Sequence, residues 1–173
     1  MRRRAASFLL IASVVVWGIW CGGQYFNEAR VIPKLLSAPP GSIVAYNAIP
    51  SEGGLPFFFP LNPLFFLLSL AAAVTAWKWA RRSRKWLVLS VLIGFGVALA
   101  LILYLAPLIG GLTAEAGKVP AAETVARADA WRFGNRIRLV VEVFGFVCTV
   151  MALRVWSAEA AGEGESGTKT EAV

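Results

Sequence analysis

The chain has 173 residues, of which 58% are apolar and 16% are charged. Ordinary soluble domains contain about 45–50% apolar residues with glycine counted, and about 25% charged residues. A chain of this length has too little interior to bury such an excess of apolar surface. A water-soluble monomer is therefore not expected, and part of the surface must face lipid.

The chain contains no histidine, which excludes His-ligated haem, His zinc sites and Ser-His-Asp triads. Its two cysteines, Cys21 and Cys148, form no CxxC pair and are too few for a disulfide scaffold or a thiolate metal cage. We therefore expect no metal and no cofactor, and we interpret both cysteines as packing residues.

The net charge of +7 is distributed unevenly along the chain. Residues 157–173 carry four Glu and one Lys and have little apolar material, which predicts a disordered acidic tail. The cations of the remaining chain lie in short clusters beside long apolar runs, as in residues 2–4 and 81–85. This pattern is typical of membrane topology signals, so we expect a lipid bilayer as partner and no nucleic acid.

Three uncharged segments are long enough to cross a ~30 Å hydrocarbon core, which takes about 20 helical residues. A fourth segment, residues 131–156, is long enough but contains three Arg and one Glu. The first segment is longer than the 7–15 residues usual for a signal-peptide core and lacks an A-x-A site, so we predict a retained anchor. We predict an all-α integral membrane four-helix bundle in residues 1–156, with spans at about residues 5–27, 57–79, 86–109 and 131–156.

The numbers of Lys and Arg on the two sides of the predicted spans predict the orientation of the chain in the membrane. Four spans with an inside N-terminus place ten cations in the cytoplasm and four in the outer loops. We therefore expect a multi-pass protein of the bacterial plasma membrane with both termini cytoplasmic, whereas a three-span alternative would export the acidic tail. The connection at 81–85 is short and makes the second and third spans antiparallel neighbours, while seven prolines between the first and second spans predict a long Pro-rich outer loop.

Polar residues recur on one face of the fourth span at steps of three and four residues. Arg138 and Glu142 are spaced i, i+4, and a charge facing lipid near mid-membrane costs at least about 2.5–3.5 kcal/mol, so each needs a partner. Arg132 and Arg136 are predicted to point away, toward headgroups. The pair is either a structural salt bridge or part of a functional site, and both interpretations stay open.

A second polar stripe on the first span also lies at its outer end. The three Arg of the fourth span crowd a helix N-terminus, where the dipole is already positive, and this favours an anionic ligand. We predict an outer polar pocket, with residues 33–60 as its lid, for an amphipathic aromatic or anionic small molecule. The predicted lining is Gln24, Glu28, Asn62, Tyr104, Trp131, Asn135, Arg138 and Glu142.

Two of these residues have simpler interpretations. Asn62 is a good N-cap before Pro63, and Tyr104 suits an interfacial aromatic belt. Arg138 would hold an anionic or enolate oxygen, and Glu28 or Glu142 would be the carboxylate available for proton transfer in a chain without His.

Several short motifs resemble a four-helix membrane family that includes the fungal anthrone oxygenases and many bacterial relatives. The motifs are Val31-Ile32-Pro33, Phe59-Pro60-Leu61-Asn62-Pro63, Leu105-Ala106-Pro107 and Trp131-x3-Asn135-x2-Arg138. The resemblance covers residues 5–156 and implies a four-helix bundle. For some members it implies cofactor-free oxidation of an anthrone-type polyketide, although this chain has no imidazole base for such a reaction.

Three classes of function are therefore in competition. The first is a membrane enzyme or binding protein for an amphipathic small molecule, with cofactor-free oxygenation as its narrower form. The second is a non-catalytic accessory membrane subunit. A transporter is the least favoured, because the sequence shows no internal repeat.

Overall fold

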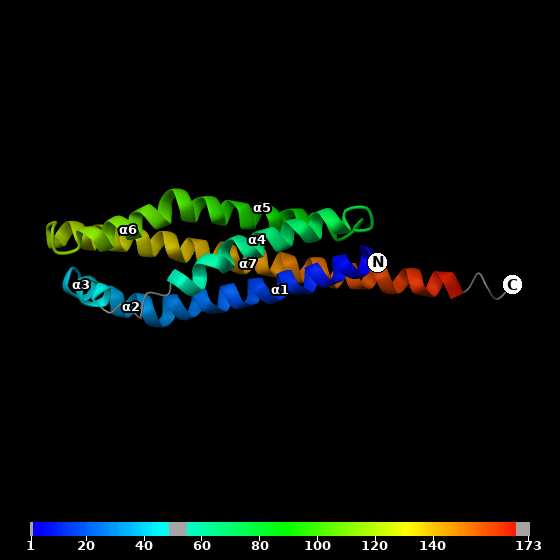
Figure 1. The fold of residues 1–173 in the computed structure, drawn as a ribbon, viewed down its shortest axis with the longest axis horizontal. Coiled ribbons are helices and arrows are strands. Elements are labelled where there is room, and N and C mark those ends of the chain that lie inside the picture. Colours follow the sequence, from blue (N-terminus) through cyan, green and yellow to red (C-terminus); the bar gives the residue numbers. More distant parts are fainter. Residues whose placement is uncertain (1, 49–54, 169–173) are drawn as a thin grey trace.

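The computed structural model describes residues 2–48 and 55–168, and these ranges are helical with no strand (Figure 1). The first helix, α1 (Arg2–Phe26), continues through the π-helical turn η1 (Asn27–Val31) into α2 (Ile32–Leu35). The remaining elements are α3 (Gly41–Asn47), α4 (Leu55–Ala76), α5 (Arg84–Ala100), the π-helical turn η2 (Leu101–Leu105), α6 (Ala106–Glu115) and α7 (Ala121–Thr168).

Four long helices run side by side along the molecule (Figure 1). Helix α1 packs against α4 and α7, and α5 packs against the same two helices, so the order around the bundle is α1, α4, α5, α7. The N-terminus, the connection 77–83 and the C-terminal part of α7 lie at one end, here called the N-terminal end. Elements α2, α3 and α6 lie at the opposite, distal end.

Three helical stretches of the described chain are long and apolar enough to cross a membrane: Arg3–Leu35, Arg84–Glu115 and Ala121–Glu159. A shorter apolar stretch, Pro63–Ala76, lies within α4. At ~1.5 Å per residue the three long stretches measure about 50 Å or more, against a hydrocarbon core of ~30 Å. The bundle is therefore longer than the hydrocarbon core is thick.

Two prolines lie just after π-helical turns, where the sequence predicted a loop or a helix end. Pro33 is the second residue after η1, and Pro107 is the second residue after η2. A proline ring clashes with the carbonyl four residues earlier and offers it no N–H, whereas a π-helical turn widens the helix at that point. The widened turns let both helices continue, so the stretch beginning at Arg84 does not end near 109 but reaches Glu115.

The predicted Pro-rich loop, residues 33–60, is therefore shorter than expected. Pro33 belongs to α2, and Pro56 and Pro60 belong to α4, so only residues 36–54 lie between helices, and part of these forms α3. Pro56 lies in the first turn of α4, where a missing N–H breaks no helical hydrogen bond. Residues 49–54 lie outside the described part of the chain. The predicted lid over residues 33–60 is therefore wrong in its bounds, because helices α2 and α4 occupy the two ends of this range.

The C-terminal helix also extends further than predicted. Helix α7 reaches Thr168, so residues 157–168 are helical where the composition predicted a disordered tail. Ala and Glu, which are frequent there, are good helix formers. Glu159 also contacts the α4–α5 connection, accepting a hydrogen bond from the Arg82 backbone N–H at 2.7 Å. Residues 169–173 lie outside the described chain.

Aromatic side chains fill the middle of the bundle. Trp17 and Trp20 of α1 pack against Phe65 of α4, with ring centroids 4.2 and 5.5 Å apart respectively. Cys21 belongs to the same core, and Cys148 is fully buried, as expected for packing residues. Large apolar side chains such as Leu103 and Val140, each more than 70% exposed, lie on the outer surface. An apolar surface of this kind is suited to contact with lipid.

Candidate functional site

The buried polar side chains of α1 and α7 meet toward the distal end of the bundle. Gln24 lies in the last turn of α1, and Glu28 lies in η1. The two helices pack side by side, so their polar stripes face each other. The resulting distal polar cluster consists of Gln24, Glu28, Arg132, Asn135, Arg136, Arg138 and Glu142.

An ion pair occupies the deepest part of this cluster. Arg138 Nε lies 3.4 Å from Glu142 Oε1, and the two side chains are 8% and 0% exposed. Arg138 Nη2 also donates a hydrogen bond of 2.6 Å to Gln24 Oε1. The predicted i, i+4 pairing of Arg138 with Glu142 is thus present in the structure.

The hydrogen-bonding capacity of this pair is incomplete. The indole of Trp20 interacts with the Glu142 carboxyl group. Apart from Arg138 and Trp20, neither Glu142 oxygen has a partner in the described chain, and Arg138 Nε makes no hydrogen bond there. Buried carboxylates and guanidinium groups usually have their hydrogen bonds filled. The pair therefore keeps hydrogen-bonding capacity that the described chain does not fill, although both side chains are buried.

Glu28 lies between three side chains of α7. It accepts a hydrogen bond of 3.0 Å from Asn135 Nδ2 and one of 2.7 Å from Arg136 Nε. Arg132 Nε lies 3.8 Å from the same carboxylate. The prediction that Arg132 and Arg136 point away from the polar face is wrong. Both guanidinium groups lie near the carboxylate of Glu28 on the neighbouring helix, which supplies their negative counter-charge.

Two predicted pocket residues are not part of the cluster. Trp131 is 8% exposed and packs with Ile32 and Leu105 in an apolar core. Tyr104, in η2, is 55% exposed. Asn62 lies within α4, seven residues after its first residue, so the N-cap interpretation is wrong; its side chain lies outside the described part of the chain. Of the predicted lining, the structure brings together Gln24, Glu28, Asn135, Arg138 and Glu142.

A chain of hydroxyl groups, which the sequence did not predict, lies on the side of this cluster that faces the N-terminal end of the bundle. Ser13 Oγ lies 2.8 Å from Ser69 Oγ, which also accepts a hydrogen bond of 3.0 Å from Trp17 Nε1. Ser90 Oγ lies 2.6 Å from Thr149 Oγ1 and 3.5 Å from Ser69 Oγ. This hydroxyl seam connects α1, α4, α5 and α7. Its sequence signal is the presence of a hydroxyl residue within each apolar span.

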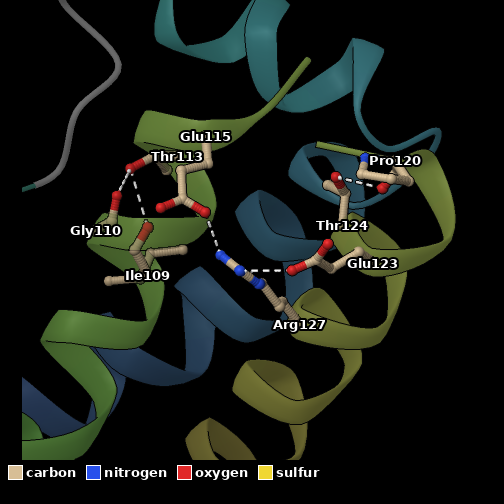
Figure 2. Close-up of polar contacts among 8 residues, drawn as sticks. All are labelled: Ile109, Gly110, Thr113, Glu115, Pro120, Glu123, Thr124 and Arg127. Atoms are coloured by element: carbon tan, nitrogen blue, oxygen red, sulfur yellow. Dashed lines mark hydrogen bonds and ion pairs between the residues drawn. The ribbon is translucent and has the colours of Figure 1, made fainter. Parts of the chain in front are cut away.

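Figure 2 shows a second charged group, at the turn between α6 and α7. Arg127 pairs with Glu115, at the end of α6, and donates a hydrogen bond of 2.6 Å to Glu123. These two hydrogen bonds raise the pKa of Arg127 above its usual value. The group fastens α6 to α7 at the distal end, and its one cation faces two carboxylates, which leaves one negative charge in excess.

The distal polar cluster is equipped to hold an anion and contains no group suited to a metal. Its three guanidinium groups face two carboxylates, which leaves one positive charge in excess. No group of three or more Asp, Glu, Cys or His side chains capable of holding a metal ion occurs in the described ranges. An oxyanion bound here would accept hydrogen bonds from Arg138, with Glu142 beside it as a candidate proton carrier.

Comparisons with protein-family models, curated proteins and solved structures gave no match to this chain. Its resemblance to the family that includes the anthrone oxygenases therefore stays a prediction.

Proposed function

We propose that the chain is a four-span integral membrane protein that binds an anionic, amphipathic small molecule in the distal half of its bundle. The observation that carries this proposal is the buried Arg138–Glu142 pair, whose hydrogen bonds are incomplete. Arg138 would hold the anionic group of the ligand. The apolar remainder of the ligand would lie among the aromatic and aliphatic side chains that surround the cluster.

Energetics support a role for this pair beyond holding the fold together. Removing two charges from water is expensive, and apolar replacements of a buried ion pair are often equally or more stable. Ionisable groups inside membrane-spanning helices are accordingly rare and are commonly found at functional sites. Gln24 orients the guanidinium from a different helix, which keeps its position defined.

The charge distribution supports insertion with the N-terminal end in the cytoplasm of a bacterial cell. Cations gather at that end of the bundle, where the described side chains include Arg3, Arg4, Lys78, Arg81, Arg82, Arg84, Lys85 and Arg154. The positive-inside rule favours the side of the membrane with the larger number of Lys and Arg in short loops as the cytoplasmic side. Both termini then face the cytoplasm, and the distal polar cluster lies in the outer leaflet.

One observation favours a second candidate, a non-catalytic accessory subunit. Gln24 and Arg138 bond to each other, and Glu28 already accepts hydrogen bonds from Asn135 and Arg136. In that case the cluster fastens α1 to α7 and receives no ligand. The two candidates differ in whether a small anion binds at Arg138.

Binding of naphthalene-2-carboxylate to the purified full-length chain tests the proposal, with naphthalene-2-carboxamide as the neutral probe. Titration calorimetry of the chain in phosphatidylcholine nanodiscs is expected to show saturable binding of the carboxylate and weak binding of the amide. Arg138→Gln should weaken carboxylate binding at least about tenfold, since a charged hydrogen bond contributes ~1.5–3 kcal/mol. Arg30→Gln is the matched control, because Arg30 is an exposed cation near the distal end.

Two outcomes would contradict the proposal. Equal carboxylate affinity in the wild-type chain and Arg138→Gln would exclude Arg138 as the anion site. Absence of saturable binding to the wild-type chain would favour the accessory subunit. The double variant Arg138→Gln, Glu142→Gln guards against misfolding, because it removes the charge without leaving Glu142 unpaired.

A further inference from the structure

A cavity of about 600 Å³ lies at the N-terminal end of the bundle, far from the distal polar cluster. It lies between α7 and the segment that joins α4 to α5. Its charged and aromatic lining consists of Arg81, Arg82, Lys85, Trp86, Arg154 and Glu159.

The lining carries four cations and one carboxylate, and the carboxylate is already occupied. Glu159 Oε1 accepts a hydrogen bond of 2.7 Å from the Arg82 backbone N–H, and its Oε2 accepts one of 3.2 Å from Ser83 Oγ. None of the four cationic side chains forms an ion pair with any side chain that the structure describes. A cavity with this charge imbalance attracts an anion.

The start of α5 adds to the positive potential of this cavity. Helix α5 begins at Arg84 with no acidic residue in its first turn and no side-chain hydrogen bond at its N-cap. The aligned peptide dipoles of a helix start carry partial positive charge, although the Arg84 and Trp86 N–H groups already donate to the Ala80 and Ser83 carbonyls. Lys85, in the same first turn, lies over the Trp86 ring at 5.4 Å and lines the cavity. An anion would offset the repulsion between these cations and the helix dipole.

We propose that this cavity binds the phosphate headgroup of an anionic phospholipid from the leaflet that surrounds the N-terminal end. The proposal rests on membrane insertion of the bundle and concerns a different site from the one described above. The cavity lies where apolar helix surface gives way to clustered cations, which is the depth of lipid phosphates. Basic pockets between helices on the cytoplasmic side are suited to such headgroups, and Trp86 belongs to the residue type enriched at that interface.

Native mass spectrometry of the full-length chain in detergent tests this proposal, with dioleoyl phosphatidylglycerol and dioleoyl phosphatidylcholine as probes. The wild-type chain is expected to retain phosphatidylglycerol in preference to phosphatidylcholine. Each cation near a membrane surface contributes roughly fivefold to anionic-lipid affinity, so Arg82→Gln with Arg154→Gln should lower phosphatidylglycerol affinity roughly 25-fold. Both side chains are exposed, so the variant should still fold.

Two controls separate this site from other effects. Arg30→Gln removes one exposed cation near the distal end and should leave lipid retention unchanged. The double variant Arg138→Gln, Glu142→Gln removes the distal pair without leaving one charge unpaired and should also leave lipid retention unchanged, so this proposal and the proposed function fail independently. Inorganic phosphate at millimolar concentration should not displace the lipid; displacement would show that the site takes free phosphate and would overturn the lipid assignment. Equal retention of both lipids, or an unchanged preference in the double variant, would overturn the proposal altogether.

Discussion

At the residue scale, Glu142 is a carboxylate that lies inside the bundle, away from water. It is fully buried, with Arg138 at 3.4 Å as its charged partner. Removing one member of a buried pair leaves the other charge without compensation, whereas removing both does not. The stability of single and double variants therefore reports directly on this pair.

We predict that Glu142→Gln destabilises the chain more than Glu142→Gln combined with Arg138→Gln. The single change should cost about 3–5 kcal/mol, because it leaves the Arg138 guanidinium buried and unpaired. The measurement is thermal unfolding of the detergent-solubilised variants. Identical melting of the wild-type chain and all variants would mean that neither group is buried.

Gly145 lies where the neighbouring side chains leave no space for a larger residue. A Cβ at this position would lie 2.7 Å from Trp17 Cη2 and 2.8 Å from Ile93 Cγ2. We predict that Gly145→Ala destabilises the bundle by about 1–3 kcal/mol, the usual range for overpacking a core. Trp17 also donates a hydrogen bond to Ser69, so its ring cannot move away without losing that bond.

Gly96→Ala is the matched control for Gly145→Ala. Gly96 lies in α5, and no atom would come within 4 Å of an added Cβ there. Ala is favoured over Gly in a helix by about 0.5–1 kcal/mol, so this variant should melt at or above the wild-type temperature. Equal loss of stability in both variants would show that crowding at Trp17 is not the cause.

The contact within one helix and the facing of the two polar stripes could be predicted from residue spacing, whereas the individual pairings between helices could not. The i, i+4 spacing of Arg138 and Glu142 predicts their contact, since successive turns bring such residues together. The pairing of Arg136 with Glu28 joins residues 108 positions apart, and no local pattern specifies it. For the same reason the burial of Trp131 against Ile32 and Leu105 was not predicted.

At the scale of elements, the hydroxyl seam connects all four long helices through hydrogen bonds of 2.6–3.5 Å. Ser90 of α5 and Thr149 of α7 form the shortest one, at 2.6 Å. Interhelical hydrogen bonds in membrane proteins contribute about 0.6 kcal/mol on average and up to ~1.7 kcal/mol. The seam therefore acts through several modest bonds that together align the four helices.

We predict that Ser90→Ala and Thr149→Val are coupled by roughly 0.6–1.7 kcal/mol in a double-mutant cycle of unfolding free energies. Ser13→Ala serves as the comparison, because Ser13 hydrogen-bonds to Ser69, whereas Thr149 hydrogen-bonds to Ser90. Strictly additive effects of Ser90→Ala and Thr149→Val would show that the two hydroxyls do not bond to each other.

The existence of the four long helices could be predicted from hydropathy, but their ends could not. Proline is normally a sign that a helix stops, and the sequence alone does not show that η1 and η2 admit Pro33 and Pro107. The contact of Glu159 with the Arg82 backbone N–H joins residues 77 positions apart. Such a contact cannot be inferred from the composition of a Glu-rich segment.

At the scale of the whole molecule, the structure brings both ends of the helical chain to the N-terminal end of the bundle (Figure 1). The connection 77–83 lies at this end too, together with most of the cations. The distal end carries α2, α3 and α6, packed around Leu35, Ile43 and Leu112. We infer that the distal end stands partly above the bilayer, because the helices exceed the ~30 Å hydrocarbon core.

Reporter fusions map this arrangement in the living cell. Fusions after Gly53, Arg84, Lys118 and Ala161 are expected to report outside, inside, outside and inside, respectively. The expectation follows from four crossings and from the excess of Lys and Arg at the N-terminal end. An outside signal after Arg84 would place the cation-rich connection 77–83 on the wrong side of the membrane.

The fusion after Ala161 tests the central claim most directly, because its location depends on whether the segment with the buried Arg138–Glu142 pair crosses the membrane. A dual reporter that fluoresces only in the cytoplasm and shows phosphatase activity only after export distinguishes the two locations in one measurement. The four-span account predicts fluorescence without phosphatase activity. Phosphatase activity without fluorescence would show an exported C-terminal segment and would contradict the account.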